Sequence, residues 1–391
     1  MTSAASDVEP FRAISISRIA HALKGQGRSI IHMEFGQPST GAPPAAIAEA
    51  HRVLDVDGMG YWESPALTAR IAALYQQRHG VEVAPERIVL TCGASPALVL
   101  ALTTRFRPGA RIAMARPGYV AYRNSVRGLS MQAVEIDCGP DERFQLTARA
   151  VEALDPAPDG LIVASPANPT GTIIDPDELA AIAEVCRRRG IAVISDEIYH
   201  GLSYAGRTAS MLEFEPPHAD DGAFVVNSFS KYWSMAGWRL GWVVVPPAHL
   251  DHARALIGNL FLTAPSLAQH AGLKAMDEHE VLEGHVRAYA ANRERMLQAL
   301  PALGLRSIAP PDGAFYIYAD IGHLLGDDLP DSLAFCERLL RDTGVATAPG
   351  LDFDPANGRR FMRFSFAVSG VEVEEALTRI GPWFAARGGK A

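Results

Sequence analysis

The sequence predicts an α/β fold in which a mostly parallel sheet is covered by helices, followed by a second domain. Between residues 86 and 245, short runs that are apolar throughout alternate with helical stretches. Such runs are typical of parallel strands that are buried on both faces. The length of 391 residues also favours more than one domain, because a domain usually holds about 100–200 residues.

The expected elements begin with residues 1–35, an amphipathic segment that ends in a strand-like run at Ile30–Phe35. Helices are expected at Ala66–Gln77, Ala97–Phe106 and Asp177–Arg189. The strands expected in the sheet are Arg87–Cys92, Arg111–Ala115, Gln132–Ile136, Leu161–Ala164, Ala192–Ser195, Ala223–Val226 and Trp238–Val245. In an open sheet of this kind, ligands bind beyond the carboxyl ends of the strands.

The chain after the sheet is expected to form a helix at His249–Phe261 and a long helical stretch from Ser266 to Leu300 that leads into the second domain. The elements expected there are a strand at Ala314–Ala319, a helix at Ser332–Arg341, strands at Val345–Thr347 and Arg360–Phe366, and a final helix at Glu372–Ala386.

Composition excludes several classes of function. The net charge is −8 and no dense Lys/Arg run occurs, so nucleic acid is not an expected partner. No apolar run reaches the length needed to span a membrane. The N-terminus carries Asp7, Glu9 and Arg12, where a signal peptide would need an apolar core. The four cysteines are far apart and form no CxxC pair, which predicts buried thiols in the cytoplasm.

A metal site is not expected either. His249 and His252 lie three residues apart with Asp251 between them, a spacing that suggests metal ligands. We expect these side chains to lie on a solvated helix face instead.

Lys231 is the centre of the most informative stretch, which runs from Asn227 to Trp242. It follows the apolar run Ala223–Val226, and a lone ammonium beside a buried strand is costly unless it is paired or chemically consumed. A Schiff base with an aldehyde would consume it. Ser228 and Arg239 are placed to face a phosphate on that aldehyde. The alternative is a surface lysine beside an aromatic-rich strand.

This stretch resembles the pyridoxal-phosphate lysine signature of class I/II aminotransferases of fold type I, in which Ser-x-Ser/Ala-Lys is followed by Gly-Trp-Arg-x-Gly. The resemblance covers nearly the whole chain. It implies that pyridoxal 5'-phosphate is the cofactor, bound as an aldimine of Lys231. It also implies a large cofactor-binding domain at 36–270 and a smaller α+β domain built from both chain ends, 1–35 and 271–391. The expected assembly is a homodimer with shared active sites.

A phosphate seat is expected at the start of the helix that follows the first strand. Gly93 permits a tight turn, Ser95 suits an N-cap, and Pro96 suits the first helical position. A helix N-terminus offers free N–H groups and the positive end of the helix dipole to a phosphate. Because proline has no N–H, Ala94 and Ser95 are the expected donors. The alternative is an ordinary capped helix.

Two tyrosines are further candidates. Tyr119, in the loop Arg116-Pro-Gly-Tyr119, can stack on a flat heteroaromatic ring, and the resemblance implies that it stacks on the pyridine. The resemblance also implies that Tyr61 reaches across a dimer interface to the cofactor phosphate. The Trp-Glu-Ser-Pro segment that follows Tyr61 departs from the Thr-rich version usual in the family.

Two motifs end neighbouring strands. Ser165–Gly171 matches the family's Asn-Pro-Thr-Gly turn, and the resemblance implies that Asn168 donates to the phenolic oxygen of the cofactor and touches the substrate. Asp196 ends the next strand, where it would hold the pyridine nitrogen protonated, and Tyr199 would bond to the phenolic oxygen. Both would keep the ring an electron sink. The alternative for Asn168 is a turn without a ligand.

The substrate carboxylate has two expected contacts. Arg363 lies within an apolar strand, and its planar fork suits a bidentate carboxylate. The resemblance implies that Arg363 grips the α-carboxylate and that Gly36 lies against it. The alternatives are a structural ion pair for Arg363 and a simple strand-to-loop turn for Gly36. Reading a second carboxylate would need another cation, for which Arg12 and Arg18 are candidates.

The predicted function is therefore transfer of an amino group between an L-amino acid and a 2-oxo acid by a ping-pong mechanism. The same site is also compatible with a carbon–sulfur β-lyase. A non-enzymatic regulatory protein is less expected, because the sequence offers no segment for a helix-turn-helix domain. A decarboxylase is disfavoured, because Arg363 would hold the carboxylate that has to leave. The sequence leaves open which amino donor and which acceptor are used.

Overall fold

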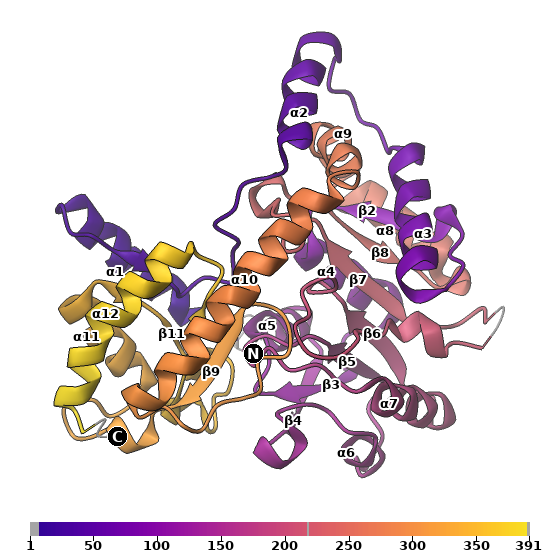
Figure 1. The fold of residues 1–391 in the computed structure, drawn as a ribbon. Coiled ribbons are helices and arrows are strands. Elements are labelled where there is room, and N and C mark those ends of the chain that lie inside the picture. The colour runs from indigo at the N-terminus through magenta and orange to yellow at the C-terminus, as the bar shows by residue number, and fades with distance from the viewer. Residues whose placement is uncertain (1–7, 217–218, 389–391) are drawn as a thin grey trace, which may run out of the picture.

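A seven-stranded sheet forms the centre of the computed structural model, which describes residues 8–216 and 219–388 (Figure 1). Its strand order is β2-β8-β7-β6-β5-β3-β4. The strands are β2 (Ile88–Thr91), β3 (Arg111–Arg116), β4 (Gln132–Asp137), β5 (Gly160–Ala164), β6 (Ala192–Asp196), β7 (Phe224–Ser228) and β8 (Gly241–Val244). All seven expected strands are present. The sheet is largely parallel, since only β8 runs antiparallel to its neighbours β2 and β7.

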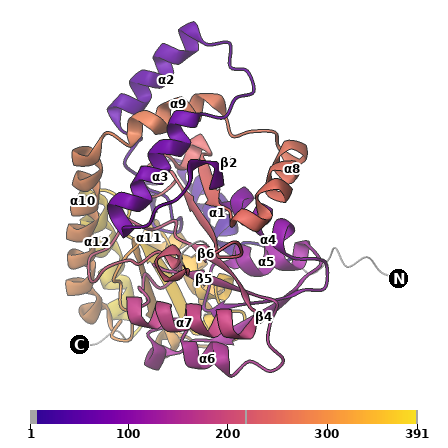
Figure 2. The ribbon, with the colours of Figure 1, turned by 90° about the vertical axis from the view of Figure 1, so that its right-hand side faces the viewer.

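Helices cover both faces of this sheet (Figure 2). Consecutive strand residues point to opposite sides, so Ile162 packs into one apolar cluster and Val163 into the other. The helices on the first face are α4 (Ala94–Arg105), α5 (Val120–Gly128) and α8 (Leu250–Leu260); those on the second include α3 (Pro65–His79), α6 (Ala148–Glu152) and α7 (Pro176–Arg189). The predicted fold class is confirmed.

A second group of elements is built from both ends of the described chain. The three-stranded antiparallel sheet β11-β12-β9 consists of Ala348–Pro349, Phe361–Ser365 and Tyr316–Asp320. A short parallel pair joins β1 (Ile31–His32) to β10 (Val345–Ala346). The helices beside these strands are α1 (Arg12–Gly25), α11 (Ser332–Thr343) and α12 (Gly370–Ala386).

Three further helices complete the fold. In Figure 1, α10 (His279–Ala299) crosses from the second group toward the seven-stranded sheet. The helix α9 (Ser266–Ala275) packs against α2 (Pro44–Val56), and α2 projects from the rest of the chain.

Three details of the sequence prediction are wrong. Trp238, expected to begin a strand, lies in the 3-10 turn Ala236–Trp238, and β8 begins only at Gly241, after Arg239 with its positive φ of 55°. The helical stretch from Ser266 is broken after Ala275, where Arg70 donates to the Met276 carbonyl (3.2 Å). The helices α2, α5 and α6 were not expected.

Within residues 8–216 and 219–388, no helix has both the length and the apolar character needed to cross a membrane. The same residues contain no group of three or more His, Cys, Asp or Glu side chains placed to hold a metal. His249 contacts Asp221 (3.1 Å), and His252 is exposed.

Candidate active site

A cavity of about 290 Å³ lies at the carboxyl ends of β5, β6 and β7. Most of the predicted site residues line it, and they come from segments that are far apart in the sequence. The predicted residues in its wall are Gly36, Ala94, Ser95, Tyr119, Asn168, Asp196, Tyr199, Lys231, Arg239 and Arg363.

Lys231 follows β7 and turns its amine into the cavity. Its Nζ donates a hydrogen bond to the Gly36 carbonyl (2.5 Å). Burial, together with the nearby cations Arg363 and Arg239, lowers the pKa of this amine to about 8 against the opposing effect of Asp196. A larger share of the amine is therefore neutral near pH 7 than for an exposed lysine, and the neutral amine is the nucleophile.

Asp196 is a buried carboxylate at the end of β6. Its Oδ2 accepts from the Tyr122 hydroxyl (2.6 Å) and its Oδ1 from the Ile198 N–H (3.1 Å). Burial raises its pKa against the opposing effects of these two hydrogen bonds and of Lys231, and no cation lies within 4.0 Å of it among the described residues. The site therefore fits a ligand that brings a protonated nitrogen to this carboxylate. Tyr122, which orients Asp196, was not predicted.

The expected phosphate seat is formed by α4 and Arg239. The helix begins at Ala94, directly after Gly93, whose φ is +97°. A Cβ on Gly93 would lie 2.5 Å from Nη2 of Arg239, so only glycine lets the guanidinium lie against the start of the helix. Helix N–H groups and a guanidinium together form an anion site.

Ser228 is not part of the cavity wall. Its side chain is fully buried, and its Oγ accepts from the backbone N–H of Ser230 (3.1 Å). Ser230 itself lines the cavity, although it was not among the predicted site residues. The bond between Ser228 Oγ and the Ser230 N–H braces the turn that carries Lys231.

Arg363 is almost completely buried in the middle of β12. Its Nη1 donates to Oδ1 of Asn168 (2.7 Å) and its Nη2 to the carbonyl of Glu34 (2.5 Å), while Nε has no partner. Its guanidinium also faces the ring of Tyr316 at 4.4 Å. No carboxylate lies within 4.0 Å of it in the described part of the chain, so the alternative of a structural ion pair is not observed there.

Tyr316 is a second site residue that sequence reasoning missed. Its hydroxyl lies 2.6 Å from that of Tyr199, and its ring lines the cavity. A Cβ on Gly36 would lie 1.8 Å from the Tyr316 hydroxyl. Gly36 therefore makes room for Tyr316, in addition to presenting its carbonyl to Lys231.

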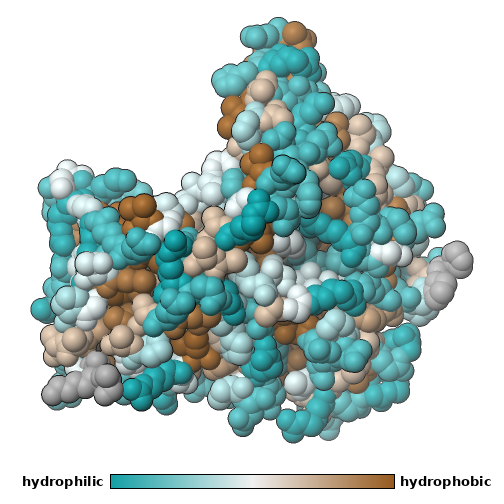
Figure 3. Space-filling model, viewed as in Figure 1, coloured by the Kyte–Doolittle hydropathy of each residue, from teal (hydrophilic) through white to brown (hydrophobic). Residues whose placement is uncertain are grey.

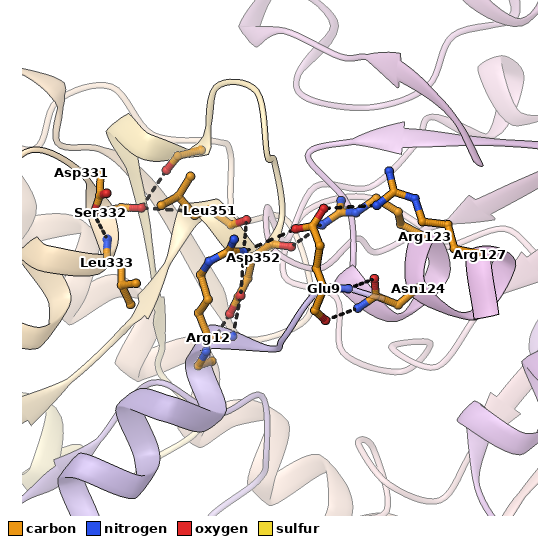
Figure 4. A network of polar contacts seen from close by, with 12 residues as sticks. Glu9, Arg12, Arg123, Asn124, Arg127, Asp331, Ser332, Leu333, Leu351 and Asp352 are labelled. Atoms are coloured by element: carbon orange, nitrogen blue, oxygen red, sulfur yellow. Dashed lines mark hydrogen bonds and ion pairs between the residues drawn. The ribbon is translucent and has the colours of Figure 1, made fainter. Parts of the chain in front are cut away.

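The N-terminal segment closes one side of the cavity with Phe11. Figure 4 shows Arg12 held by polar contacts to the segment at residues 351–352: its Nη1 donates to the Leu351 carbonyl (3.2 Å) and its backbone N–H to Asp352 (2.8 Å). Arg18 is exposed, and neither arginine is part of the cavity wall. Neither candidate therefore supplies a second cation to the site of this chain.

The network in Figure 4 fixes this segment at both ends. The Glu9 carboxylate pairs with Arg127 (3.2 Å) on α5, and both oxygens of Asp352 accept backbone N–H groups at the start of α1. This anchoring holds Phe11 beside Tyr119, with ring centroids 6.3 Å apart.

Tyr61 is 84% exposed and does not line the cavity. Its expected contact is with a neighbouring subunit, so its role stays a prediction.

Charge balance decides what the cavity accepts. The charged residues in its wall are the cations Lys231, Arg239 and Arg363 and the carboxylate Asp196. Because two cations remain after one is balanced, the cavity favours anions such as a phosphate ester and a carboxylate. Most of the remaining wall is apolar or aromatic, which suits an amino acid side chain without charge.

Comparisons with known proteins agree with this geometry. Residues 28–380 match the family model described as "Aminotransferase class I and II". The chain is 45% identical over 381 residues to a valine–pyruvate aminotransferase of Mycobacterium tuberculosis, covering 96% of each protein. It is 31% identical to an aspartate/prephenate aminotransferase of Thermus thermophilus, covering 95% of each. A crystal structure of an aminotransferase from Mycobacterium tuberculosis superposes with a TM-score of 0.93 at 43% identity, covering 99% of each chain.

The fold is that of the α/β enzymes of fold type I. In this chain, the cavity at the sheet edge contains one lysine and two arginines. The chain belongs to the class I and II aminotransferase family. It is a transaminase, and enzymes of this family depend on pyridoxal phosphate.

Proposed function

We propose that the cavity binds pyridoxal 5'-phosphate and that Lys231 is its covalent attachment point. The observation that carries this proposal is a group of charges that face one cavity: the buried carboxylate of Asp196, the buried guanidinium of Arg363 and the more exposed Lys231 and Arg239, with no ion pair among them within 4.0 Å in the described part of the chain. Each would gain a partner from the cofactor or from an amino acid. The close approach of the Arg239 guanidinium to Gly93 supports placing the phosphate at the start of α4.

The cofactor contacts follow from the positions of the side chains. The N–H groups of Ala94 and Ser95 and the guanidinium of Arg239 would hold the phosphate, with Ser228 bracing the turn that carries Lys231. Tyr119 would stack on the ring. Asp196 would keep the pyridine nitrogen protonated, while Asn168 and Tyr199 would bond to the phenolic oxygen. Bound in this way, the cofactor supplies an electron sink for the carbanion formed at the amino acid's α-carbon.

Two residues would act on the substrate itself. Arg363 would grip the α-carboxylate and so fix the direction of the Cα–H bond. Once the amino acid has displaced its amine, Lys231 would act as general base and take the proton from the α-carbon. It would then act as general acid and deliver this proton to the aldehyde carbon of the cofactor. Because Arg363 holds the carboxylate in place, transamination is favoured over decarboxylation.

We propose an amino donor with an uncharged, aliphatic side chain, and pyruvate as an acceptor. Phe11, Phe35 and Ile198 line the cavity, and no described residue in its wall is a cation beyond the three already assigned. The name of the M. tuberculosis relative, valine–pyruvate aminotransferase, points the same way.

We also propose a homodimer in which Tyr61 reaches the phosphate of the neighbouring subunit. The proposed division into a large domain at 36–270 and a small one from 1–35 and 271–391 is supported by the pairing of β1 with β10. The four cysteines are all free, which supports a cytoplasmic location.

The test is a panel of amino donors assayed against pyruvate and 2-oxoglutarate. We expect valine and similar aliphatic donors to have a higher kcat/KM than aspartate or glutamate. A preference for dicarboxylates would contradict the substrate proposal. Pyruvate release from cystathionine, measured in parallel, separates this function from the β-lyase alternative, and faster release than transamination would contradict the proposal.

A further inference from the structure

Directly behind the proposed site lies a buried pair of ionisable side chains to which no role has been given. Glu197 follows Asp196 and is 1% exposed, and His200 follows Tyr199 and is 3% exposed. Both belong to the segment that carries two proposed site residues, but they point away from the cavity and are not part of its wall.

The hydrogen bonds of Glu197 are unevenly divided between its two oxygens. Its Oε1 accepts from the Ser195 hydroxyl (3.1 Å), the Ser210 hydroxyl (3.0 Å) and the Met211 N–H (2.9 Å). Its Oε2 is buried and has no hydrogen-bond partner. A buried polar atom in this state is costly unless it bonds to something.

His200 has the complementary arrangement. Its Nε2 lies 3.2 Å from the carbonyl oxygen of Ser165, and a carbonyl can only accept, so Nε2 carries a hydrogen. Its Nδ1 is buried without a hydrogen-bond partner and lies 3.4 Å from Oε2 of Glu197. The two unpartnered atoms therefore face each other.

One proton between these atoms satisfies both of them. We propose that Glu197 and His200 share a single proton between Oε2 and Nδ1, and that the pair is a positioning device that ties the segment carrying Asp196 and Tyr199 to the turn carrying Asn168. The connection runs from His200 Nε2–H to the Ser165 carbonyl, the first residue of that turn. The positioning role rests on the proposed function of Asn168, whereas the shared proton does not.

The surroundings favour retention of this proton at neutral pH. Burial, together with nearby Glu213, raises the pKa of Glu197 to about 8 against the opposing effect of the hydrogen bonds to Oε1. Burial, His79 and Arg78 hold the pKa of His200 well below its usual value, so a second proton is disfavoured. The titratable and charged groups that face the pair are Tyr75, Arg78 and His79 of α3, and Glu213 of the turn at Met211–Phe214.

The shared proton makes a specific prediction for stability against pH. The raised pKa of Glu197 means that the folded state holds a proton which the unfolded chain loses above pH 4.5, so this stability falls as the pH rises toward about 8. The lowered pKa of His200 has the opposite sign, with stability rising as the pH approaches 6.5. The two trends cancel between pH 4.5 and 6.5. The contribution of the pair to stability then falls as the pH rises from 6.5 to about 8.

Glu197→Gln tests this directly, because the amide N–H takes the place of the shared proton and cannot titrate. The melting temperature of the variant minus that of the wild type should rise steadily from pH 5 to pH 8, by about 2–4 °C. Glu49→Gln is the control. Glu49 accepts from Arg52 (2.8 Å), has a lowered pKa and is not among the charges that face the pair, so its difference should not rise over this range. A flat or falling difference for Glu197→Gln would overturn the shared proton, whatever the enzyme's substrates are.

The positioning role has its own measurement in the cofactor-loaded enzyme. His200→Phe keeps an aromatic ring but loses the bond to the Ser165 carbonyl. We expect the KM of both amino donor and acceptor to rise by about 2–10-fold, the equivalent of one neutral hydrogen bond, with a smaller change in kcat. A lower melting temperature with unchanged KM values would show that the pair is merely structural. If this variant does not fold, the pH series on Glu197→Gln still decides whether the proton is shared.

Discussion

Arg363→Lys is the substitution whose effect follows most directly from the geometry. Arg363 donates one N–H to Asn168 and one to the Glu34 carbonyl. Its Nε and its further N–H groups are left to bind a carboxylate. A lysine keeps the charge but offers no planar fork. We therefore expect it to lose one of two parallel hydrogen bonds to the α-carboxylate. At about 1.5–3 kcal/mol for a charge-assisted bond, KM should rise about 10–100-fold.

The assay is steady-state kinetics with several amino donors and several 2-oxo acids. Every KM should rise by a similar factor, because all of these molecules present the same α-carboxylate. Arg360→Lys is the matched control: it lies one residue before β12, is 56% exposed in its side chain, and pairs with Asp320, so its kinetics should not change. A rise confined to one substrate would place Arg363 in the side-chain pocket and refute the assignment.

Three further substitutions test other parts of the site. Asp196→Asn should lower kcat by about 10²-fold with a smaller loss of cofactor affinity, because an amide cannot stabilise a protonated pyridine; activity within about twofold of wild type would show a structural role. Gly93→Ala should weaken cofactor retention about 10-fold, measured by equilibrium dialysis, because the new methyl meets Arg239 and φ is +97°. Tyr61→Phe should weaken cofactor retention more than kcat and lower dimer stability in sedimentation; a monomer with full cofactor and full activity would contradict the shared site.

Most of the sheet was predictable because strands such as β2, β5, β7 and β8 are buried on both faces and so appear in the sequence as short, largely apolar runs. The errors lie where a contact with a distant residue decides the local structure. Trp238 is apolar and follows the pattern of a strand, but it lies in the turn that brings Arg239 against Gly93, more than a hundred residues earlier. The long helix expected from Ser266 ends early where Arg70 caps its carbonyl at Met276.

The same limit applies to the site. Lys231, Asn168 and Asp196 were predictable because each lies in a short motif at the end of a strand. Tyr122 was missed because its hydrogen-bond partner Asp196 lies 74 residues away in the sequence. Tyr316 was missed because its partner Tyr199 lies 117 residues away. For Tyr122 a signal existed in the sequence, since it lies three residues after Tyr119 and so shares its helix face.

The proposed role of Arg12 or Arg18 in specificity depended on a direction that sequence cannot give. The direction of Arg12 is set by the Asp352 carboxylate and the Leu351 carbonyl, both more than three hundred residues away. The pocket for the substrate side chain is accordingly the part of the site that needed the structure most.

The most direct test of the account is covalent mapping of the cofactor. The purified enzyme should absorb near 400–430 nm, the range of a pyridoxal phosphate bound to a lysine as a Schiff base. Borohydride should remove this band and fix the cofactor to the chain, and peptide mass mapping should then find it on Lys231. Lys231→Ala should remain folded, show neither the band nor the label, and be inactive. A label on Lys24, Lys274 or any other lysine would contradict the assignment of the site.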